Sequence, residues 1–405
     1  MYLTRSLEKI LRESSASFPA VLVTGPRQVG KSTLLEHCAL EGRRAVSLDH
    51  PAVRAKAKSD PELFFQAYPP PVLIDEIQYA PELFPFIKMQ ADQAKKSGMF
   101  WMTGSQQFSM MRNVSESLAG RVAILDMLGL SQAEIAGVAD VGTFLDSLLA
   151  ASPRAHGGPV GLRGLYQTML RGSYPALYEK PAMKTGVFYS SYVKTYIERD
   201  IRSLLDISQE STFLKFLSVV AARTGQIVNY SDMSRDLGLS PNTVRSWISL
   251  LESSRLVYML RPYHTNLTSR VVKTPKLYFT DTGLCSYLTG WTSPETLEAG
   301  AMNGAMLETY VVMEIVKSFW HRGLEAPLYF YRDKDKNEID VIIEADGFLH
   351  PVEIKKTANP SLKDIRHFKL LDNARLKRGR GAVLCLASER LPLTRDVTVM
   401  NVGDI

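Results

Sequence analysis

The sequence predicts a multidomain α/β protein, and three patterns along its 405 residues support that prediction. Near the N-terminus, a glycine-rich loop stands between a short apolar strand and a helix. In the middle, two helices are separated by a tight turn and followed by a strand. The last third alternates a long helix, three strands, a helix and a strand. We expect four parts, which cover residues 1–150, 151–210, 211–290 and 291–405.

Composition and charge indicate which partners and which cellular compartment suit the chain. A net charge of +6 permits nucleic-acid binding without requiring it. The three cysteines, Cys38, Cys285 and Cys385, are far apart, which argues against a structural zinc site and for a reducing compartment. No apolar run approaches the roughly 18 residues that a membrane-spanning helix needs. We therefore predict a cytoplasmic protein with no membrane partner.

The glycine-rich loop fits the pattern GxxxxGK[ST]. Its residues are Gly25, Pro26, Arg27, Gln28, Val29, Gly30, Lys31, Ser32 and Thr33. A strand at 20–23 precedes it and a helix at 32–40 follows, so backbone N–H groups and a helix N-terminus point at one anion. Lys31 can reach the β- and γ-phosphates, and Ser32 can ligate Mg²⁺. The motif predicts ATP and Mg²⁺ as cofactors.

A second strand, at 72–74, ends in two carboxylates, Asp75 and Glu76. An acid at the end of a parallel strand beside a phosphate-binding loop can hold Mg²⁺, and Asp75 fits that role. Glu76 then fits a general base that polarises the attacking water. The alternative, a solvated strand end, suits this apolar strand less well.

Two further positions are candidates near the γ-phosphate. A strand at 99–102 ends in Thr103-Gly-Ser105, where Ser105 or Thr103 could contact the phosphate, although a plain turn also explains the sequence. Arg121 precedes a strand at 122–125 and could stabilise charge on the transferred phosphoryl group. It could act within its own subunit or on a neighbour, and a surface ion pair is the competing interpretation. Action in trans predicts a homo-oligomer.

These motifs, in this order, resemble one family. The order runs from Val21–Thr33 through Leu73–Gln78, Thr103–Ser105 and Ser117–Arg121. It continues through Gly172–Pro175, Glu198–Asp200 and Lys276–Leu284 to Glu338–Asp340 and Glu353–Lys355. It resembles the prokaryotic AAA-type ATPases that carry a C-terminal domain of unknown function. The resemblance implies a P-loop ATPase of the AAA superfamily over the first part of the chain.

The middle of the chain predicts a helical linker and a winged helix. Glycine and proline cluster at 151–164, and helical patterns follow to about residue 205, where a lid would lie. Helices are expected at 212–223, 231–237 and from Pro241, with a wing strand at 255–260. The third helix presents polar residues suited to a DNA major groove: Asn242, Thr243, Arg245 and Ser246. An ATPase lid or a protein-docking module is the alternative.

The last third places charged residues on an apolar framework. Glu308 interrupts the apolar stripe of a helix at 300–320. Strands are expected at 328–331, 338–344 and 349–355, with Asp340 in the second. Glu353 and Lys355 are two apart in the third strand, so both face one side. A helix at 361–372 and a strand at 382–386 complete the pattern.

This order resembles the PD-(D/E)xK core of restriction-endonuclease-like domains. The resemblance implies that Asp340 and Glu353 share a divalent metal, Mg²⁺ or Mn²⁺, and that Glu308 adds a ligand or holds the waters of the metal. Lys355 would stabilise charge on the scissile phosphate or lower the pKa of a metal-bound water. The sequence thus predicts an ATP-hydrolysing protein coupled to a DNA-binding, nuclease-like module. The alternative is an ATP-switched regulator that binds DNA or protein and carries an inactive nuclease-like scaffold.

Overall fold

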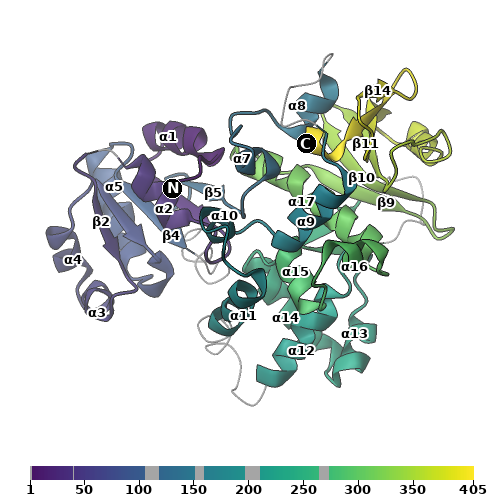
Figure 1. Cartoon of the computed structure of the whole chain (residues 1–405). Helices are drawn as coiled ribbons and strands as arrows, with labels where there is room; N and C mark the ends of the chain where they lie inside the picture. Colours follow the sequence, from purple (N-terminus) through teal and green to yellow (C-terminus); the bar gives the residue numbers. More distant parts are fainter. Residues whose placement is uncertain (1, 40, 105–117, 151–158, 197–209, 264–272) are drawn as a thin grey trace. The chain divides into compact units, whose positions relative to one another are not determined.

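The computed structural model describes residues 2–39, 41–104, 118–150, 159–196, 210–263 and 273–405 (Figure 1). The chain divides into two compact units. The first comprises residues 1–130 with two short segments, 253–255 and 320–324, and the second comprises the rest. Ser105 lies outside the described residues, as do 151–158 and 197–209 of the predicted linker and lid.

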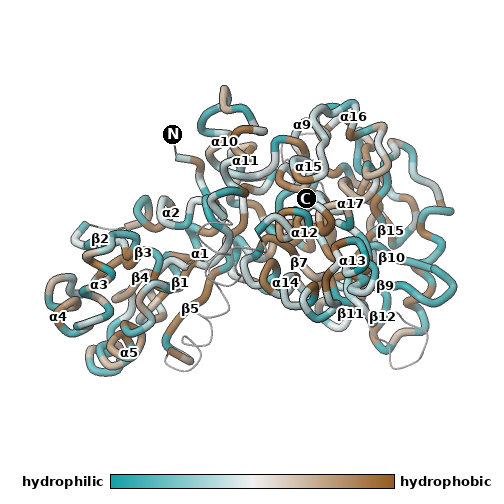
Figure 2. Tube along the Cα trace, turned by 90° about the horizontal axis from the view of Figure 1, so that it is seen from below, coloured by the Kyte–Doolittle hydropathy of each residue, from teal (hydrophilic) through white to brown (hydrophobic). Residues whose placement is uncertain are grey.

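The first unit is built on a five-stranded parallel sheet in the order β2-β3-β4-β1-β5. Its strands are β1 (Ala20–Thr24), β2 (Arg44–Ser47), β3 (Val72–Asp75), β4 (Phe100–Gly104) and β5 (Val122–Asp126). All of β1 and β4 is buried, and Figure 2 colours most of β1 toward the apolar end of its scale. Continuous apolar strands are typical of parallel sheets covered on both faces. Because the strands are parallel, their carboxyl ends meet at one edge.

Helices cover this sheet. They are α1 (Leu7–Ser17), α2 (Lys31–Cys38), α3 (Pro51–Ser59), α4 (Pro61–Ala67), η1 (Ile77–Tyr79) and α5 (Leu83–Ala94). Local chemistry sets the start of α4, where the Asp60 side chain accepts a hydrogen bond from Leu63 N and Pro61 occupies the first turn. Phe64 and Ile87 are fully buried in the core that these helices form with β1, β3 and β4.

Residues far along the chain complete the first unit. Asp126, at the end of β5, accepts a hydrogen bond of 2.8 Å from Thr24 Oγ1 at the end of β1. Its other oxygen lies 3.0 Å from Arg255 Nη2, and the Arg255 guanidinium stands 4.4 Å from the centre of a Trp320 ring. The two short segments are therefore fastened beside the start of the phosphate-binding loop. No sequence pattern predicts this contact, because Asp126 and Arg255 are far apart in the chain.

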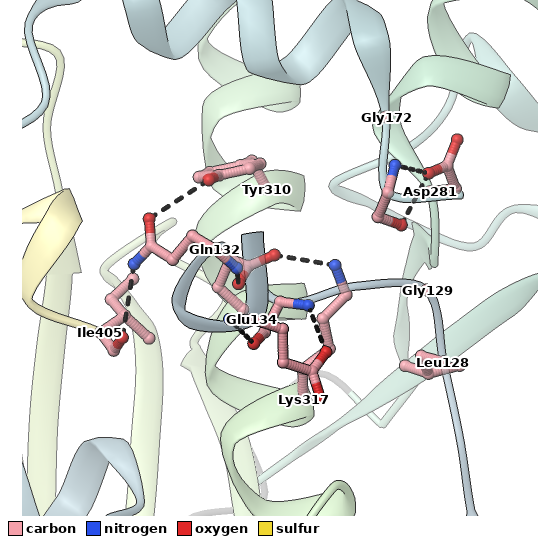
Figure 3. Close-up of polar contacts among 12 residues, drawn as sticks. Leu128, Gly129, Gln132, Glu134, Gly172, Asp281, Tyr310, Lys317 and Ile405 are labelled. Carbon is pink, nitrogen blue, oxygen red and sulfur yellow. Dashed lines mark hydrogen bonds and ion pairs between the residues drawn. The ribbon is translucent and has the colours of Figure 1, made fainter. Parts of the chain in front are cut away.

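The described residues at the start of the second unit form the helices α7 (Gln132–Ile135), α8 (Phe144–Leu149), α9 (Leu162–Arg171), α10 (Pro175–Glu179) and α11 (Thr185–Tyr196). Gln132 connects α7 to two other parts of the unit (Figure 3). Its side-chain oxygen accepts a hydrogen bond from Tyr310 Oη, and its nitrogen donates to the carbonyls of Val402 and Ile405. This short segment thus ties the C-terminal residues to the long helix that carries Tyr310.

The helix-turn-helix pattern is present as local structure. Its elements are α12 (Glu210–Ala221), β6 (Gln226–Ile227), α13 (Tyr230–Leu237), α14 (Pro241–Ser253), β7 (Val257–Pro262) and β8 (Lys276–Phe279). Gly238 makes the turn with a φ of 66°, in the left-handed region that glycine enters without steric cost. Asn242, Arg245 and Ser246 are exposed and Thr243 is half-buried, so the expected face is accessible within this unit. DNA binding by that face stays a prediction.

One sheet runs through the predicted wing and the C-terminal part. Its order is β14-β15-β13-β11-β10-β9-β7-β8-β6, with β12 on β11. β7 pairs in parallel with β9 through Arg261 and Tyr329, so the wing strand continues into the C-terminal sheet. The remaining elements are α15 (Thr282–Leu288), α16 (Pro294–Ala299), α17 (Asn303–Trp320), β9 (Leu328–Arg332), β10 (Glu338–Ala345), β11 (Phe348–Ile354), η4 (Phe368–Asn373), β12 (Lys377–Arg378), β13 (Gly381–Cys385), β14 (Leu391–Pro392), β15 (Val397–Asn401) and η5 (Val402–Asp404).

The predicted helix at 361–372 is wrong as an α-helix. The structure has turns over 362–367 and then the 3₁₀ helix η4. Phe368 and Leu371 are the residues of η4 that enter the core, and they are three residues apart. That spacing matches the three residues per turn of a 3₁₀ helix, which places both side chains on one side.

Length and polarity of the helices bear on membrane crossing. No helix in the described parts of the chain combines the length and the apolar composition that a bilayer crossing requires.

Candidate functional site

The phosphate-binding loop closes tightly over the end of β5. Gly25 has a φ of 147° and Gly30 a φ of 94°, both in the region that favours glycine. A Cβ at Gly25 would lie only 1.9 Å from the carbonyl oxygen of Met127, so no side chain fits there. The loop is therefore shaped by backbone contacts, and α2 begins at Lys31, one residue before the predicted start of the helix.

Lys31 turns back over this loop. Its Nζ donates hydrogen bonds of 3.0 Å to Gly25 O and 2.7 Å to Pro26 O, and the residue is buried. Neutral carbonyls are weaker partners for an ammonium group than phosphate oxygens. The loop thus holds a cation at the position where the β- and γ-phosphates of a nucleotide would bind.

The Asp75 carboxylate accepts hydrogen bonds from three hydroxyl groups. Its Oδ1 accepts hydrogen bonds from Ser32 Oγ at 2.5 Å and Thr103 Oγ1 at 2.7 Å. Its Oδ2 accepts one from Ser47 Oγ at 3.1 Å. The predicted Mg²⁺ pair, Ser32 and Asp75, is therefore adjacent, which fits a cation bound between them. Sequence reasoning missed Ser47; its signal was a polar residue ending a strand next to β3.

Glu76 has an unusual backbone. Its φ of 58° and ψ of 49° place a residue other than glycine in the left-handed region, and its N–H donates to Thr103 Oγ1 at 2.9 Å. Its carboxylate lies 3.9 Å from Arg27 Nη1 of the phosphate-binding loop and accepts a hydrogen bond from Gln78. Strained backbone of this kind concentrates at functional sites. Among the described candidates, Thr103 is thus the residue whose hydroxyl hydrogen-bonds both to the Asp75 carboxylate and to the Glu76 backbone.

Arg121 has a partner within its own unit. Its Nε lies 2.5 Å and its Nη2 3.1 Å from the two carboxylate oxygens of Asp92 on α5. This bidentate pair lowers the pKa of Asp92, chiefly through the hydrogen bond from Arg121. The geometry matches the ion-pair interpretation, and a role for Arg121 in trans stays a prediction.

A second cluster of charges lies in the C-terminal sheet. Val341 of β10 pairs with Val352 of β11, so the flanking residues Asp340 and Glu353 are neighbours on one face. Asp340 Oδ2 accepts a hydrogen bond from Ile354 N at 2.8 Å, and Glu353 Oε1 lies 2.5 Å from Lys355 Nζ. The structure therefore brings together the three residues that the sequence predicts.

Burial perturbs both carboxyl groups of this cluster. Burial, followed by repulsion from Asp340, raises the pKa of Glu353 to about 8. Burial and the neighbouring Glu308 raise the pKa of Asp340 to about 6. Two close carboxylates away from water disfavour double ionisation. Near neutral pH the pair therefore keeps a proton that a bound cation would displace.

Glu308 of α17 lies in the same cluster but is already engaged. Its Oε1 accepts hydrogen bonds from Lys276 Nζ at 2.8 Å and Tyr278 Oη at 2.6 Å. Lys276 also pairs with Glu338. Sequence reasoning missed Lys276 and Tyr278. Their signal was their spacing: they stand two apart in an otherwise apolar strand, so they share one face.

The structure does not show the metal site that the sequence predicts for this cluster. In the portion of the chain that the structure describes, no three His, Cys, Asp or Glu side chains are arranged to hold one metal ion. Asp340 and Glu353 offer two carboxylates, and two carboxylates completed by waters suffice for Mg²⁺. Glu308 forms an ion pair with Lys276 and is not available to the metal in this arrangement. Metal binding here stays a prediction.

The family comparison identifies the first part of the chain. Residues 17–136 match the family described as AAA domain. They form an AAA-type P-loop ATPase domain. Residues 162–295 and 303–405 match two families described as domains of unknown function, DUF8612 and DUF4143. The AAA-type prediction is confirmed, and the matches to the other parts assign no chemistry.

Two curated relatives match nearly the whole chain. The uncharacterized proteins Rv2008c of Mycobacterium tuberculosis and Mb2031c of Mycobacterium bovis are each 29% identical over 398 residues, which is 98% of this chain and 82% of theirs. The similarity therefore extends through both the AAA-type domain and the C-terminal part of this chain.

Three solved structures show partial similarity to this chain. The Walker-type ATPase PABY2304 of Pyrococcus abyssi is 14% identical, with a TM-score of 0.43 over 71% of this chain and 96% of its own. AMPPCP-bound DnaA from Aquifex aeolicus is 12% identical, with a TM-score of 0.30 over 62% and 86%. The Thermotoga maritima RuvB Holliday junction branch migration motor is 15% identical, with a TM-score of 0.29 over 62% and 88%.

Proposed function

We propose that this chain binds and hydrolyses ATP and uses the nucleotide to control a nucleic-acid-binding part with a metal-dependent, nuclease-like site. The observation that carries the first half is the convergence of Lys31, Asp75 and Glu76 at one edge of the parallel sheet. Phosphate cradle, cation ligands and a carboxylate base are the parts that phosphoryl transfer to water requires.

Each residue of the ATP site has a distinct task in this proposal. Lys31 exchanges the loop carbonyls for the β- and γ-phosphates. Ser32 and Asp75 hold Mg²⁺, which neutralises phosphate charge when it is bound. Glu76 accepts a hydrogen bond from the attacking water and takes its proton. Arg27, 3.9 Å from the Glu76 carboxylate, keeps that base oriented toward the loop.

The second half of the proposal rests on Asp340, Glu353 and Lys355. The two carboxylates would hold Mg²⁺ or Mn²⁺, and the Lys355 ammonium would stabilise negative charge on a phosphodiester. Exposed polar residues at the start of α14, such as Asn242 and Arg245, would contact DNA. Incubating the purified chain with DNA and RNA, with and without ATP and Mn²⁺, tests this assignment directly.

One observation favours a second candidate function. Glu308 is bound by Lys276 and Tyr278, so one predicted metal ligand is engaged elsewhere. An ATP-switched regulator with an inactive nuclease-like scaffold fits that arrangement. ATP hydrolysis stimulated by DNA, with no cleavage under any metal condition, would select this alternative.

We predict that Arg121 acts on nucleotide bound to another subunit of a homo-oligomer. Arg121→Ala is expected to lower ATP hydrolysis by about a hundredfold, because the guanidinium would no longer stabilise transition-state charge. Mixing Arg121→Ala chains with Lys31→Ala chains should restore part of the activity, since each supplies what the other lacks. Phosphate release by the mixture measures this.

Asp92→Asn is the matched control, because it removes the negative charge that pairs with Arg121 inside the chain and leaves the arginine in place. It should retain activity. If mixed oligomers form, as mass measurement would show, but no activity returns, the arginine does not act in trans.

A further prediction concerns metal and pH at the C-terminal cluster. Because the folded chain keeps a proton on Glu353 up to a pKa of about 8, against an ordinary value of 4.5, its free energy of unfolding should fall as pH rises between these values. Mn²⁺ should reverse that loss by displacing the proton. Melting temperatures at pH 5 and 8, with EDTA or Mn²⁺, measure both effects.

Substitutions separate the roles at this cluster. Asp340→Asn should remove most of the Mn²⁺ stabilisation and any cleavage, whereas Lys355→Ala should keep the stabilisation and lose cleavage. ATP hydrolysis should persist in both. Cleavage that survives both substitutions would place the nuclease activity elsewhere.

A further inference from the structure

The most deeply buried ammonium group of the acidic cluster belongs to a residue that the proposed function does not use. Lys276 is only 2% exposed and lies on β8, facing α17 and β10. Its Nζ contacts the carboxylates of Glu308, at 2.8 Å, and of Glu338. Asp340 is close enough to act on it electrostatically. One lysine thus stands among three acidic side chains that come from two different elements.

The surroundings keep this lysine charged. Burial alone would lower its pKa, but Glu308, Glu338 and Asp340 together raise it above the ordinary value. An ammonium group in such a place serves as a fixed positive charge, because losing its proton would leave the carboxylates uncompensated. Tyr278 Oη adds a hydrogen bond of 2.6 Å to the same Glu308 oxygen that Lys276 contacts. Lysine and tyrosine together therefore hold the Glu308 carboxylate.

We infer that Lys276 is an internal cation that competes with a divalent metal for Glu308, so that metal binds tightly only when Lys276 releases that carboxylate. The inference rests on the proposed metal site at Asp340 and Glu353. With Glu308 engaged, two carboxylates remain for the metal, and weak binding results. With Glu308 released, a third carboxylate joins them.

Competition between Lys276 and the metal for Glu308 predicts a result that charge repulsion between Lys276 and the metal does not predict. Removing any positive charge near the cluster strengthens cation binding somewhat. Removing a competitor for Glu308, in contrast, strengthens metal binding only while Glu308 is present to serve as a ligand. Lys276 and Glu308 should therefore be coupled in metal binding, and a double-substitution cycle measures that coupling.

The experiment titrates Mn²⁺ by calorimetry into the full chain and four variants: Lys276→Met, Glu308→Gln, the double variant and Arg332→Met. Lys276→Met should bind Mn²⁺ about tenfold more tightly than the parent, and the gain should shrink to about threefold or less in the Glu308→Gln background. Arg332→Met is the charge control, because Arg332 lies 2.9 Å from Glu338 and pairs with that acid instead of Glu308. It should change the affinity by less than about threefold.

The outcomes are distinct. An equal gain in the parent and Glu308→Gln backgrounds, or no gain at all, overturns the competition. If Lys276→Met folds only with Mn²⁺, as circular dichroism would show, the metal has replaced the lysine and the inference stands. If it never folds while the double variant does, the inference fails. Tight Mn²⁺ binding by Lys276→Met without DNA cleavage would leave the inference standing and remove the proposed nuclease activity.

Discussion

Glu76→Gln is expected to slow ATP hydrolysis by about a hundredfold or more while ATP binding persists. Glutamine keeps the size of the side chain and its hydrogen bond to Gln78, but it cannot accept a proton from water. The left-handed backbone of Glu76, fixed by its N–H to Thr103 Oγ1, should hold the substitute in the same place. The slower ATP hydrolysis would therefore reflect the loss of the catalytic base and not misfolding of the variant.

Lys31→Ala supplies the contrast, because it should abolish ATP binding or turnover by removing the cation of the phosphate-binding loop. Binding is measured with a fluorescent nucleotide and hydrolysis by phosphate release. Glu82→Gln, at an exposed glutamate just before α5, is the matched control and should leave both unchanged. Hydrolysis by Glu76→Gln at the parent rate would show that another group activates the water.

The arrangement of the phosphate-binding loop and Asp75 could be predicted from sequence because its information is local. Gly25, Lys31 and Asp75 sit in short motifs whose spacing reflects one turn or one strand. Ser47 could not be predicted in the same way. It reaches Asp75 because β2 and β3 pair in a register that places Ser47 opposite Asp75, and register depends on the packed sheet.

The C-terminal cluster shows the same division. Alternation of side chains along β10 and β11 is enough to predict that Asp340, Glu353 and Lys355 share one face. Lys276 contacts Glu308 from a different element, 32 residues away in sequence, so no local pattern joins them. A 3₁₀ helix forms after β11 where an α-helix was expected, and this likewise depends on which side chains pack into the core.

Asp281 connects two sequence motifs that have no part in the ATP site, Gly172–Pro175 and Lys276–Leu284. It is buried, and its Oδ2 accepts hydrogen bonds from Ser173 N at 2.6 Å and Ser173 Oγ at 2.8 Å. Its Oδ1 accepts from Leu284 N at 2.6 Å and lies 2.8 Å from Tyr189 Oη. Figure 3 shows this carboxylate beside the Gly172 segment. A Cβ at Gly172 would lie 2.0 Å from Tyr189 Oη, so glycine is required at the contact.

Asp281→Ala is therefore expected to lower the free energy of unfolding of the second unit by about 4 kcal/mol, because it leaves buried donors on Ser173 and Leu284 without an acceptor. For a unit of this size the melting temperature should fall by roughly 10 °C. Asp281→Asn keeps one acceptor oxygen and should lose about half as much. Scanning calorimetry of the full chain measures the shift.

The control for this prediction is Asp372→Ala, which removes an exposed carboxylate paired with Arg378 at 2.6 Å. Exposed ion pairs contribute less than about 1 kcal/mol, so its melting temperature should stay near that of the parent. Equal shifts for Asp281→Ala and Asp372→Ala would mean that the hydrogen bonds around Asp281 do not hold the two motifs together. A large shift confined to Asp281→Ala would instead give the Gly172–Pro175 and Lys276–Leu284 motifs a shared structural role, separate from the chemistry of Glu76 and Asp340.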